Sequence, residues 1–169
     1  DEVLSTLSRA TIEDMQHLQY DVVSLQARDL LKIFLPCLPE GEIKSRLSDW
    51  DCSYSTHSYE ATLFSRLYRN VLLEIFGHEQ GIGWRRMLYL CSRVGFSTMV
   101  LTAIDRLLAR DESLWWAGRD KCELIRKAAG RLSGEQEEPW STINAFQFTN
   151  RFVESRFVGR AFGMHTREM

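Results

Sequence analysis

The residues best suited to proton transfer or metal binding are four histidines, and they lie far apart in the chain. They occupy positions 17, 57, 78 and 165, so no two have the short spacing of metal ligands on one helix. His17 falls on the polar side of a predicted helix and is expected at the surface. His57 precedes another predicted helix, which makes it a better candidate for a base, but a surface position is again favoured. The histidines therefore predict neither a metal site nor a general base.

The carboxylates and glycines lead to the same conclusion. Asp49 and Asp51 flank Trp50, but residues two apart on a helix point away from each other, so we expect a solvated helix end rather than an acid–base pair. Glu137-Glu138 is interpreted as a solvated loop. Gly81-Ile82-Gly83 lacks the third glycine and the preceding strand of a dinucleotide site, and G-x-S-x-G does not occur. We predict no catalytic, cofactor-binding or metal-binding residue within this chain, and no cofactor.

Aromatic residues are the remaining candidates for a binding site. Trp115-Trp116 and the C-terminal phenylalanines could line a pocket for an aromatic or acyl group, although aromatic residues at helical spacing more often belong to a core. Near the C-terminus, arginines alternate with phenylalanines in the manner of a surface that stacks on nucleic acid bases. A net charge of -2 opposes that function. We instead expect a seam against another part of a larger protein, formed by Arg151, Phe152, Arg156, Phe157, Arg160 and Phe162.

Four widely spaced cysteines, Cys37, Cys52, Cys91 and Cys122, contain no C-x-x-C pair. Zinc sites need ligands at short spacings, so these cysteines do not indicate one. Cysteine is among the most buried residue types, and free buried thiols are therefore favoured over a disulfide. The sequence leaves the redox state of all four open.

The composition of the chain limits the class of protein to which it can belong. The chain has 169 residues, of which 44% are hydrophobic and 26% charged, as in an ordinary globular protein. The 21 basic residues against 23 acidic ones exclude a strongly basic nucleic-acid binder. No apolar run reaches the roughly 18 residues that a membrane helix needs. The first residues, Asp1-Glu2-Val3, do not resemble a signal peptide.

Apolar residues at three- and four-residue steps predict a mainly α fold, an irregular multi-helix segment treated as one domain over residues 1–169. Thr11 and Asp14 form a predicted capping box before one helix, or two nearly collinear helices, that Pro36 and Pro39 stop. Gly77 is predicted to end the most regular helix. Helices are expected at 12–34, 40–50, 61–76, 84–91, 98–108 and 121–132, with an aromatic-anchored coil or one short strand within 136–169.

Three stretches of the chain, in the same order, resemble the penicillin acylase (penicillin amidase) family of N-terminal-nucleophile hydrolases. Ala10–Ser24, ATIEDMQHLQYDVVS, is similar to the family's E-D-M and L-Q pattern at the start of a long helical region. Leu47–Asp51 followed by Ala61–Phe64 is similar to L-x-x-W-D and A-x-L-F. Asp111–Trp116 and Pro139–Phe148 resemble the family's tryptophan-containing turn and its later W-G-x-x-H segment. The resemblance is strongest over residues 10–76.

The resemblance has departures as well as matches. Ser141 and Asn144 stand where the family often has Gly and His, and Asn150-Arg151 replaces a common His-Pro. Any role that those positions serve beyond packing in relatives is not expected here. The 136–169 region is therefore the part of the chain in which the resemblance implies least.

The resemblance implies a parent enzyme that hydrolyses a linear amide with the N-terminal serine of its larger subunit. An α-amino group with a pKa of about 7.7–8 can accept the hydroxyl proton of that serine, and an asparagine with backbone N–H groups stabilises the oxyanion. None of these residues maps onto this chain, since Asp1 is no nucleophile and no Ser-Asn-x-Trp occurs. A periplasmic or extracellular parent is implied by the same resemblance.

We therefore expect a helical segment of the larger subunit, inactive by itself, whose partner is the remainder of the acylase that binds the acyl-amide substrate. The uncapped start at Asp1 favours such an excised segment, because an evolved terminus is more often polar and frayed. An apolar patch exposed by excision would also allow the chain to dimerise. The alternative is a stand-alone helical module that binds a partner protein through an apolar groove. Neither nucleic acid nor membrane is expected as a partner.

Overall fold

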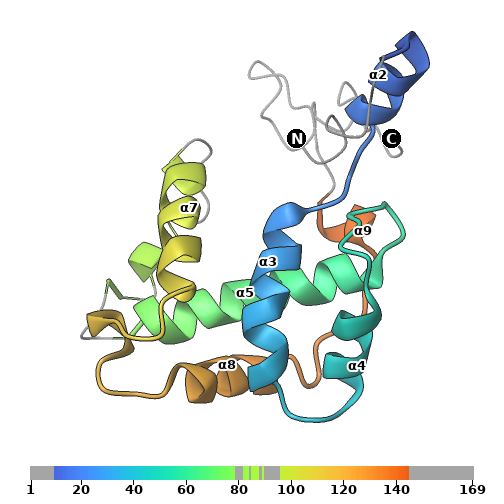
Figure 1. Ribbon diagram of the computed structural model, residues 1–169. Helices are drawn as coiled ribbons and strands as arrows, with labels where there is room; N and C mark the ends of the chain where they lie inside the picture. The colour runs from blue at the N-terminus through green and yellow to red at the C-terminus, as the bar shows by residue number, and fades with distance from the viewer. Residues whose placement is uncertain (1–9, 79–81, 84, 88, 90–95, 145–169) are drawn as a thin grey trace, which may run out of the picture.

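A computed structural model describes residues 10–78, 82–83, 85–87, 89 and 96–144, and these ranges are mainly helical (Figure 1). They contain no β-strand, only one isolated antiparallel bridge between Val23 and Ser53. The prediction of a mainly α fold is confirmed. In chain order the elements are α2 (Ile12–Gln19), α3 (Leu25–Phe34), the 3-10 helix η1 (Leu35–Cys37), α4 (Glu42–Asp49), α5 (Tyr59–Phe76), α7 (Phe96–Leu108), the 3-10 helix η2 (Leu114–Trp116), α8 (Lys121–Gly130) and α9 (Trp140–Ile143).

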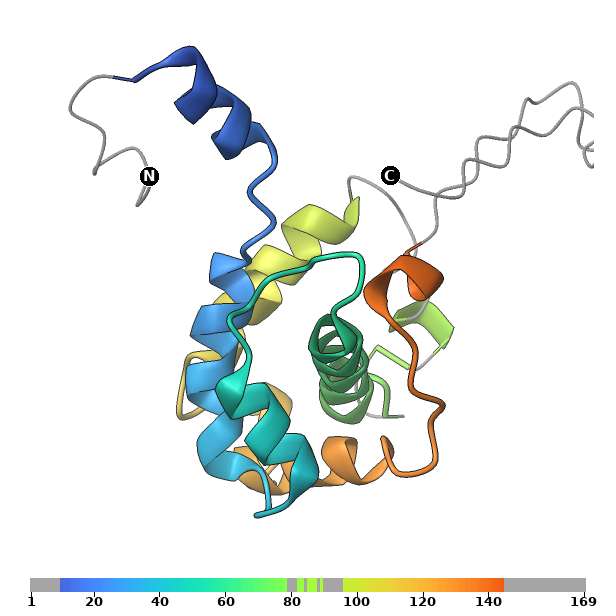
Figure 2. The same cartoon turned by 90° about the vertical axis from the view of Figure 1, so that its right-hand side faces the viewer.

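Helix α5 is the axis around which the other helices pack. Figure 2 looks along this helix and shows α3, α4 and α8 around it. Its buried side chains recur at helical spacing and include Phe64, Leu67, Val71 and Ile75, each at most 2% exposed. Because apolar residues lie on more than one side of α5, it can bury contacts with several neighbours at once. The core is therefore built outward from this helix.

Helix α5 begins and ends through two different mechanisms. At its start, the Ser58 hydroxyl accepts a hydrogen bond from the Ala61 backbone N–H. At its end, the Gly77 N–H donates to the carbonyl oxygen of Leu73 at 2.9 Å, with φ of -80°. Glycine is required there by close approach rather than by a left-handed backbone, since a Cβ at Gly77 would collide with the Leu73 carbonyl oxygen. The predicted stop at Gly77 is confirmed.

Residues 12–34 form two helices, separated by an extended break. The capping box predicted at Thr11 is present: the Thr11 hydroxyl accepts from the Asp14 N–H, and the Asp14 carboxylate accepts from the Thr11 N–H. The break is held by long-range hydrogen bonds, from the Ser24 N–H to the Cys52 carbonyl and from the Tyr54 N–H to the Val22 carbonyl, each 2.9 Å. The apolar periodicity continues through this break, so sequence alone left one helix and two helices equally open.

Helix α7 is held to α3 and α5 by one carboxylate. Asp105 accepts a hydrogen bond from Gln26 of α3 at 2.6 Å and another from the Tyr68 hydroxyl of α5 at 2.5 Å. Ile104 and Leu108 of α7 are buried in the common core. The helices predicted over 98–108 and 121–132 correspond to α7 and α8.

Other predicted segments fall partly outside the described ranges. Of the helix expected over 84–91, the structure describes residues 85–87 and 89, which are helical, and of Gly81-Ile82-Gly83 it describes Ile82 and Gly83. Within the segment predicted as coil or short strand, Trp140–Ile143 forms α9, and Phe146, Phe148 and the C-terminal arginines lie outside the described residues. No described helix is both long enough and apolar enough to cross a membrane.

Candidate functional site

The side chains considered for acid–base chemistry lie at separate places on the surface. His17 is exposed in the last turn of α2, and His57 is exposed in the turn before α5. Asp49 ends α4, whereas the Asp51 carboxylate accepts a hydrogen bond from the Ser53 N–H at 2.8 Å and so shapes the turn. Within the described residues no group of three or more His, Cys, Asp or Glu side chains could hold a metal ion. His165 lies outside those residues.

The Trp115-Trp116 pair divides between surface and core. Trp116 is 5% exposed, and its indole N–H donates to the Asp111 carbonyl at 3.1 Å, which closes the turn before η2. Trp115 is 40% exposed and meets Phe76 edge-on, with 5.1 Å between ring centroids. Two side chains that face different surroundings do not form one aromatic pocket. The core interpretation therefore holds for Trp116.

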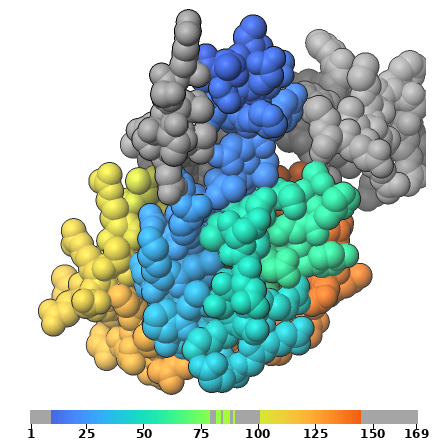
Figure 3. Space-filling model, turned by 45° about the vertical axis from the view of Figure 1, so that its right-hand side comes forward, coloured from blue at the N-terminus to red at the C-terminus, as the bar shows by residue number. Residues whose placement is uncertain are grey.

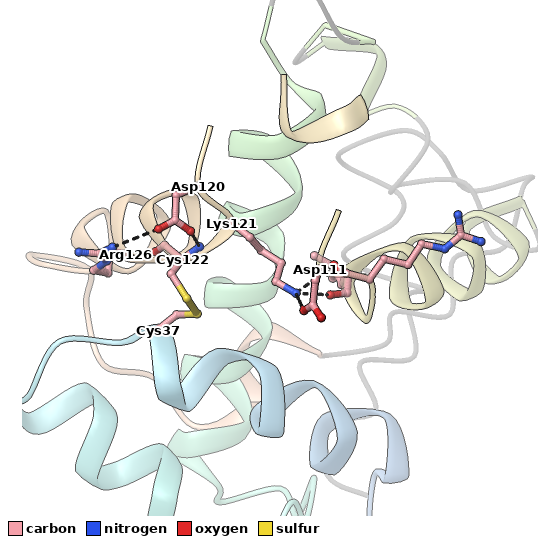
Figure 4. The surroundings of a disulfide bond; sticks show 8 residues. Cys37, Asp111, Asp120, Lys121, Cys122 and Arg126 are labelled. Carbon is pink, nitrogen blue, oxygen red and sulfur yellow. Dashed lines mark hydrogen bonds and ion pairs between the residues drawn. A yellow bond between two sulfur atoms is a disulfide. The ribbon is translucent and has the colours of Figure 1, made fainter. Parts of the chain in front are cut away.

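The expectation of free cysteines is wrong for Cys37 and Cys122, which form a disulfide (Figure 4). The bond joins η1, at the end of α3, to the first turn of α8. Cys37 is buried and Cys122 partly buried, and their separation of 85 residues gave the sequence no local signal of pairing. Cys52 is a buried free thiol, and desolvation raises its pKa. Cys91 lies outside the described residues.

Charged residues next to the disulfide complete the ends of two helices. The Asp120 carboxylate accepts from the Cys122 N–H at 2.7 Å and so caps α8 (Figure 4). Lys121 Nζ donates to the carbonyl oxygens of Leu108 and Arg110 at 3.3 and 3.0 Å, at the end of α7. A cation at a helix C-terminus is favourable because the last carbonyls carry partial negative charge. These charges serve the fold rather than a reaction.

Aromatic residues from two of the three resembling stretches meet in one cluster, together with Tyr54. Trp50 lies 5.5 Å from both Tyr54 and Phe64, measured between ring centroids, and Tyr54 lies 4.7 Å from Trp140. The Trp50 indole donates to the Ser53 carbonyl at 3.1 Å. Burial raises the pKa of the Tyr54 hydroxyl, against a smaller opposing effect of its hydrogen bond with Ser65. The cluster joins residues that lie up to 90 positions apart into one packed unit.

A cleft of about 450 Å³ lies between α4, α5 and the segment that follows α8. Its walls include the start of α4 around Ile43, the face of α5 that carries Tyr59, Thr62, Leu63 and Arg66, and residues 132–138. The volume falls in the range of about 300–1,000 Å³ that small-molecule sites occupy. Sequence reasoning did not find this cleft, because its walls are far apart along the chain.

Two arginines tie the acidic segment 135–138 to the helices across this cleft. Arg46 pairs with Glu60 at 3.1 Å and also with Glu137. Arg66 pairs with Glu138 at 2.6 Å and with Glu135 at 3.1 Å. Desolvation opposes the charged form of Arg46, but hydrogen bonds to Glu137 and Glu60 outweigh it and raise its pKa. Glu137-Glu138 lies in a loop as expected, with the Glu137 side chain 65% exposed, but its pairs with Arg46 and Arg66 were not expected.

A buried carboxylate holds α8 against α5. Glu74 is 4% exposed and pairs with Lys127 at 3.1 Å and with Arg131. Among the described residues its Oε1 has no well-aligned hydrogen bond, so its attraction to Arg131 is one of charge. Both basic partners are about half exposed or more, which lets their heads remain hydrated. This cluster has a structural role between two helices.

Comparison with models of protein families shows the family to which the chain belongs. A family model described as penicillin amidase matches residues 1–166. The chain belongs to the penicillin amidase family. No curated protein and no solved structure matches it. Family membership confirms the resemblance seen in the sequence, and in the folded chain the tryptophans that carried it, Trp50 and Trp140, lie in the aromatic cluster.

Proposed function

We propose that this chain is a non-catalytic helical portion of a penicillin-acylase-like amidohydrolase whose N-terminal serine lies on another part of the parent protein. The parent cleaves a linear amide of an acylated substrate, and this chain supplies the helical body against which the catalytic part packs. The proposal extends the family membership, and the structural roles of the motif residues support it.

The proposal depends on one observation: residues of the stretches that resemble the family have structural roles in the fold. Thr11 and Asp14 cap α2, and Ser24 caps α3 by accepting from the Ala27 N–H at 3.1 Å. Trp50 and Phe64 contact each other in the core cluster. Residues engaged in caps and ring contacts are suited to building a scaffold, and their hydrogen bonds and packing leave them no obvious part in proton transfer.

Helix α2 supplies a surface for the remainder of the parent. It stands apart from the helical body in Figures 2 and 3, and none of its residues is buried. Ile12 is 75% exposed and Met15 39%, and the break that follows exposes Tyr20 at 81% and Val22 at 47%. An amphipathic helix with an exposed apolar face gains stability when that face is covered. We propose that the catalytic part of the parent covers it.

The proposal is tested by measuring binding between this chain and the polypeptide of the same parent that carries the N-terminal serine. Replacing Ile12 and Met15 by serine should weaken binding at least tenfold without lowering the melting temperature, because both side chains are exposed. The matched control replaces Gln16 and Gln19, which are exposed on the same helix. Equal binding by both variants, or binding of an unrelated protein instead of the catalytic part, would favour the stand-alone interaction module.

A further inference from the structure

We propose that the cleft between α4, α5 and residues 132–138 binds a ligand that carries an ammonium or guanidinium group on a short apolar arm. No residue of this cleft has a role in the function proposed above, so the two proposals can fail separately. The proposal rests on the charge, the walls and one unpaired hydroxyl of the cleft.

Carboxylates outnumber cationic groups in this cleft. Five glutamates and two arginines line it, a net of -3, which Lys44, paired with Glu40, reduces to -2. The two arginines are already matched by more than one carboxylate each, as the pairs of Arg46 with Glu60 and Glu137 and of Arg66 with Glu135 and Glu138 show. The excess carboxylates leave a negative potential that a cation entering a partly enclosed cleft would neutralise.

A second observation independent of the acidic residues is the hydroxyl of Thr62. Thr62 is 2% exposed, and its Oγ1 has no hydrogen-bond partner among the described residues. It lies between Tyr59, Leu63 and Arg66 on the face of α5 that lines the cleft, at helical spacing. A buried hydroxyl without a partner costs stability, and a ligand N–H would supply the donor that this oxygen lacks.

The walls also suit the apolar arm of such a ligand. Ile43, Leu63 and Leu132 contribute aliphatic surface, and Tyr59, which is 43% exposed, adds an aromatic ring. An aromatic face attracts a cation through its quadrupole. A ligand with an apolar arm and a charged head therefore finds matching surface for both of its parts.

An anionic ligand is the opposite interpretation, because arginines and the start of α4 also line the cleft. The N-cap of α4 is Gly41, which provides no side-chain cap. However, an anion would have to displace a glutamate from Arg46 or Arg66, and Glu42 already places a carboxylate in the first turn of α4. Each lining glutamate already has a basic partner, but a carboxylate can accept a further donor, so a cation can share these carboxylates without displacing an arginine. The balance of charge thus favours the cation.

The proposal is tested by titrating the isotope-labelled chain with 2-phenylethylammonium and following amide NMR shifts. We expect saturable shifts at Ile43, Thr62 and Ser133, and at least tenfold weaker binding of 2-phenylethanol and 3-phenylpropanoate, which match the probe in size. A second titration uses Nα-acetyl-lysine amide. Tighter binding of this compound indicates that the natural ligand is a lysine side chain of a peptide. Tighter binding of 2-phenylethylammonium indicates a free amine.

Substitutions in the cleft test the same proposal without comparing different ligands. Thr62→Val should leave the melting temperature unchanged or raised, because the hydroxyl has no partner to lose, but should weaken binding about threefold or more. Glu42→Gln combined with Glu137→Gln should weaken it further, whereas Glu112→Gln, at an exposed position away from the cleft, should have no effect. Equal binding of the ammonium and the alcohol, preference for the carboxylate, or shifts confined to other parts of the chain would overturn the proposal.

Discussion

At the scale of single residues, short polar side chains satisfy backbone groups that the helices leave free. Thr11, Ser24, Ser58 and Asp120 each accept a hydrogen bond from a backbone N–H in the first turn of a helix. The Asp14 carboxylate accepts the reciprocal hydrogen bond from the Thr11 N–H at 2.8 Å. The stability of each helix start depends on whether these oxygens can accept.

The α2 cap should depend on pH. Hydrogen bonds first from the Thr11 backbone N–H and then from its hydroxyl lower the pKa of Asp14. Because the pKa of Asp14 is lower in the folded chain, its contribution to the stability of α2 is complete above its unfolded-state pKa. That contribution is lost as the pH falls through its folded-state pKa. We expect amide and Cα shifts of residues 12–15 to move towards coil over that acid range. Asp14→Asn should abolish this transition, and an unchanged transition in the variant would show that another group causes it.

The disulfide is expected to make the largest single contribution to stability. Its two cysteines are 85 residues apart, and closing a loop of that length in the unfolded chain is worth about 4 kcal/mol in the chain-entropy account. Cys37→Ala with Cys122→Ala should therefore lower the free energy of unfolding by roughly that amount in urea titrations. Non-reducing peptide mapping should recover the two cysteines in one linked fragment, and separate fragments would refute the pairing. The matched control is Cys52→Ala, which keeps the disulfide and should lose stability on reduction as the unsubstituted chain does, whereas the double variant should not respond to reductant.

These two residue-level features differ in how far the sequence could predict them. The Thr11–Asp14 box spans three residues, so its spacing is visible in the chain and the prediction is confirmed. The Cys37–Cys122 pair depends on how α3 and α8 come together around α5, which no local pattern encodes. The same reason explains why the cleft and the arginine pairs of Glu137 and Glu138 were not predicted.

At the scale of elements, α5 organises the fold through its contacts with neighbouring helices. The Glu74 side chain of α5 lies buried opposite Lys127 and Arg131 of α8, while the Asn70 amide donates to the Ala128 carbonyl at 3.4 Å. The helix itself was predictable, since its apolar face repeats over Ala61–Phe76 and Gly77 follows. Its partners were not predictable, because periodicity shows which face is buried and not which helix covers it.

The pairing of α5 with α8 should respond cooperatively to loss of charge. Lys127→Met or Arg131→Met alone should cost about 1 kcal/mol, because the remaining cation still compensates Glu74. The double variant should cost about 3 kcal/mol or more, since it leaves a buried carboxylate without a counter-charge. Urea unfolding of the four members of this cycle measures the coupling. Additive losses would mean that Lys127 and Arg131 do not compensate for each other at Glu74, and would contradict the prediction.

At the scale of the whole molecule, the described helices form one body, and the amphipathic helix α2 stands apart from it. The body is closed by the disulfide, the arginine pairs across the cleft and the aromatic cluster, whereas α2 contributes no buried residue. Folding energy is therefore concentrated away from α2, whose surface we propose is covered by another part of the parent protein. This division is consistent with the helical scaffold that we propose.

Hydrolysis of a chromogenic acyl anilide tests this account most directly. The purified chain should give no turnover by itself, whereas mixing it with the serine-bearing polypeptide of its parent should give turnover that the Ile12→Ser, Met15→Ser variant reduces at least tenfold. Turnover by this chain alone that survives purification and depends on one of its own side chains would contradict the account.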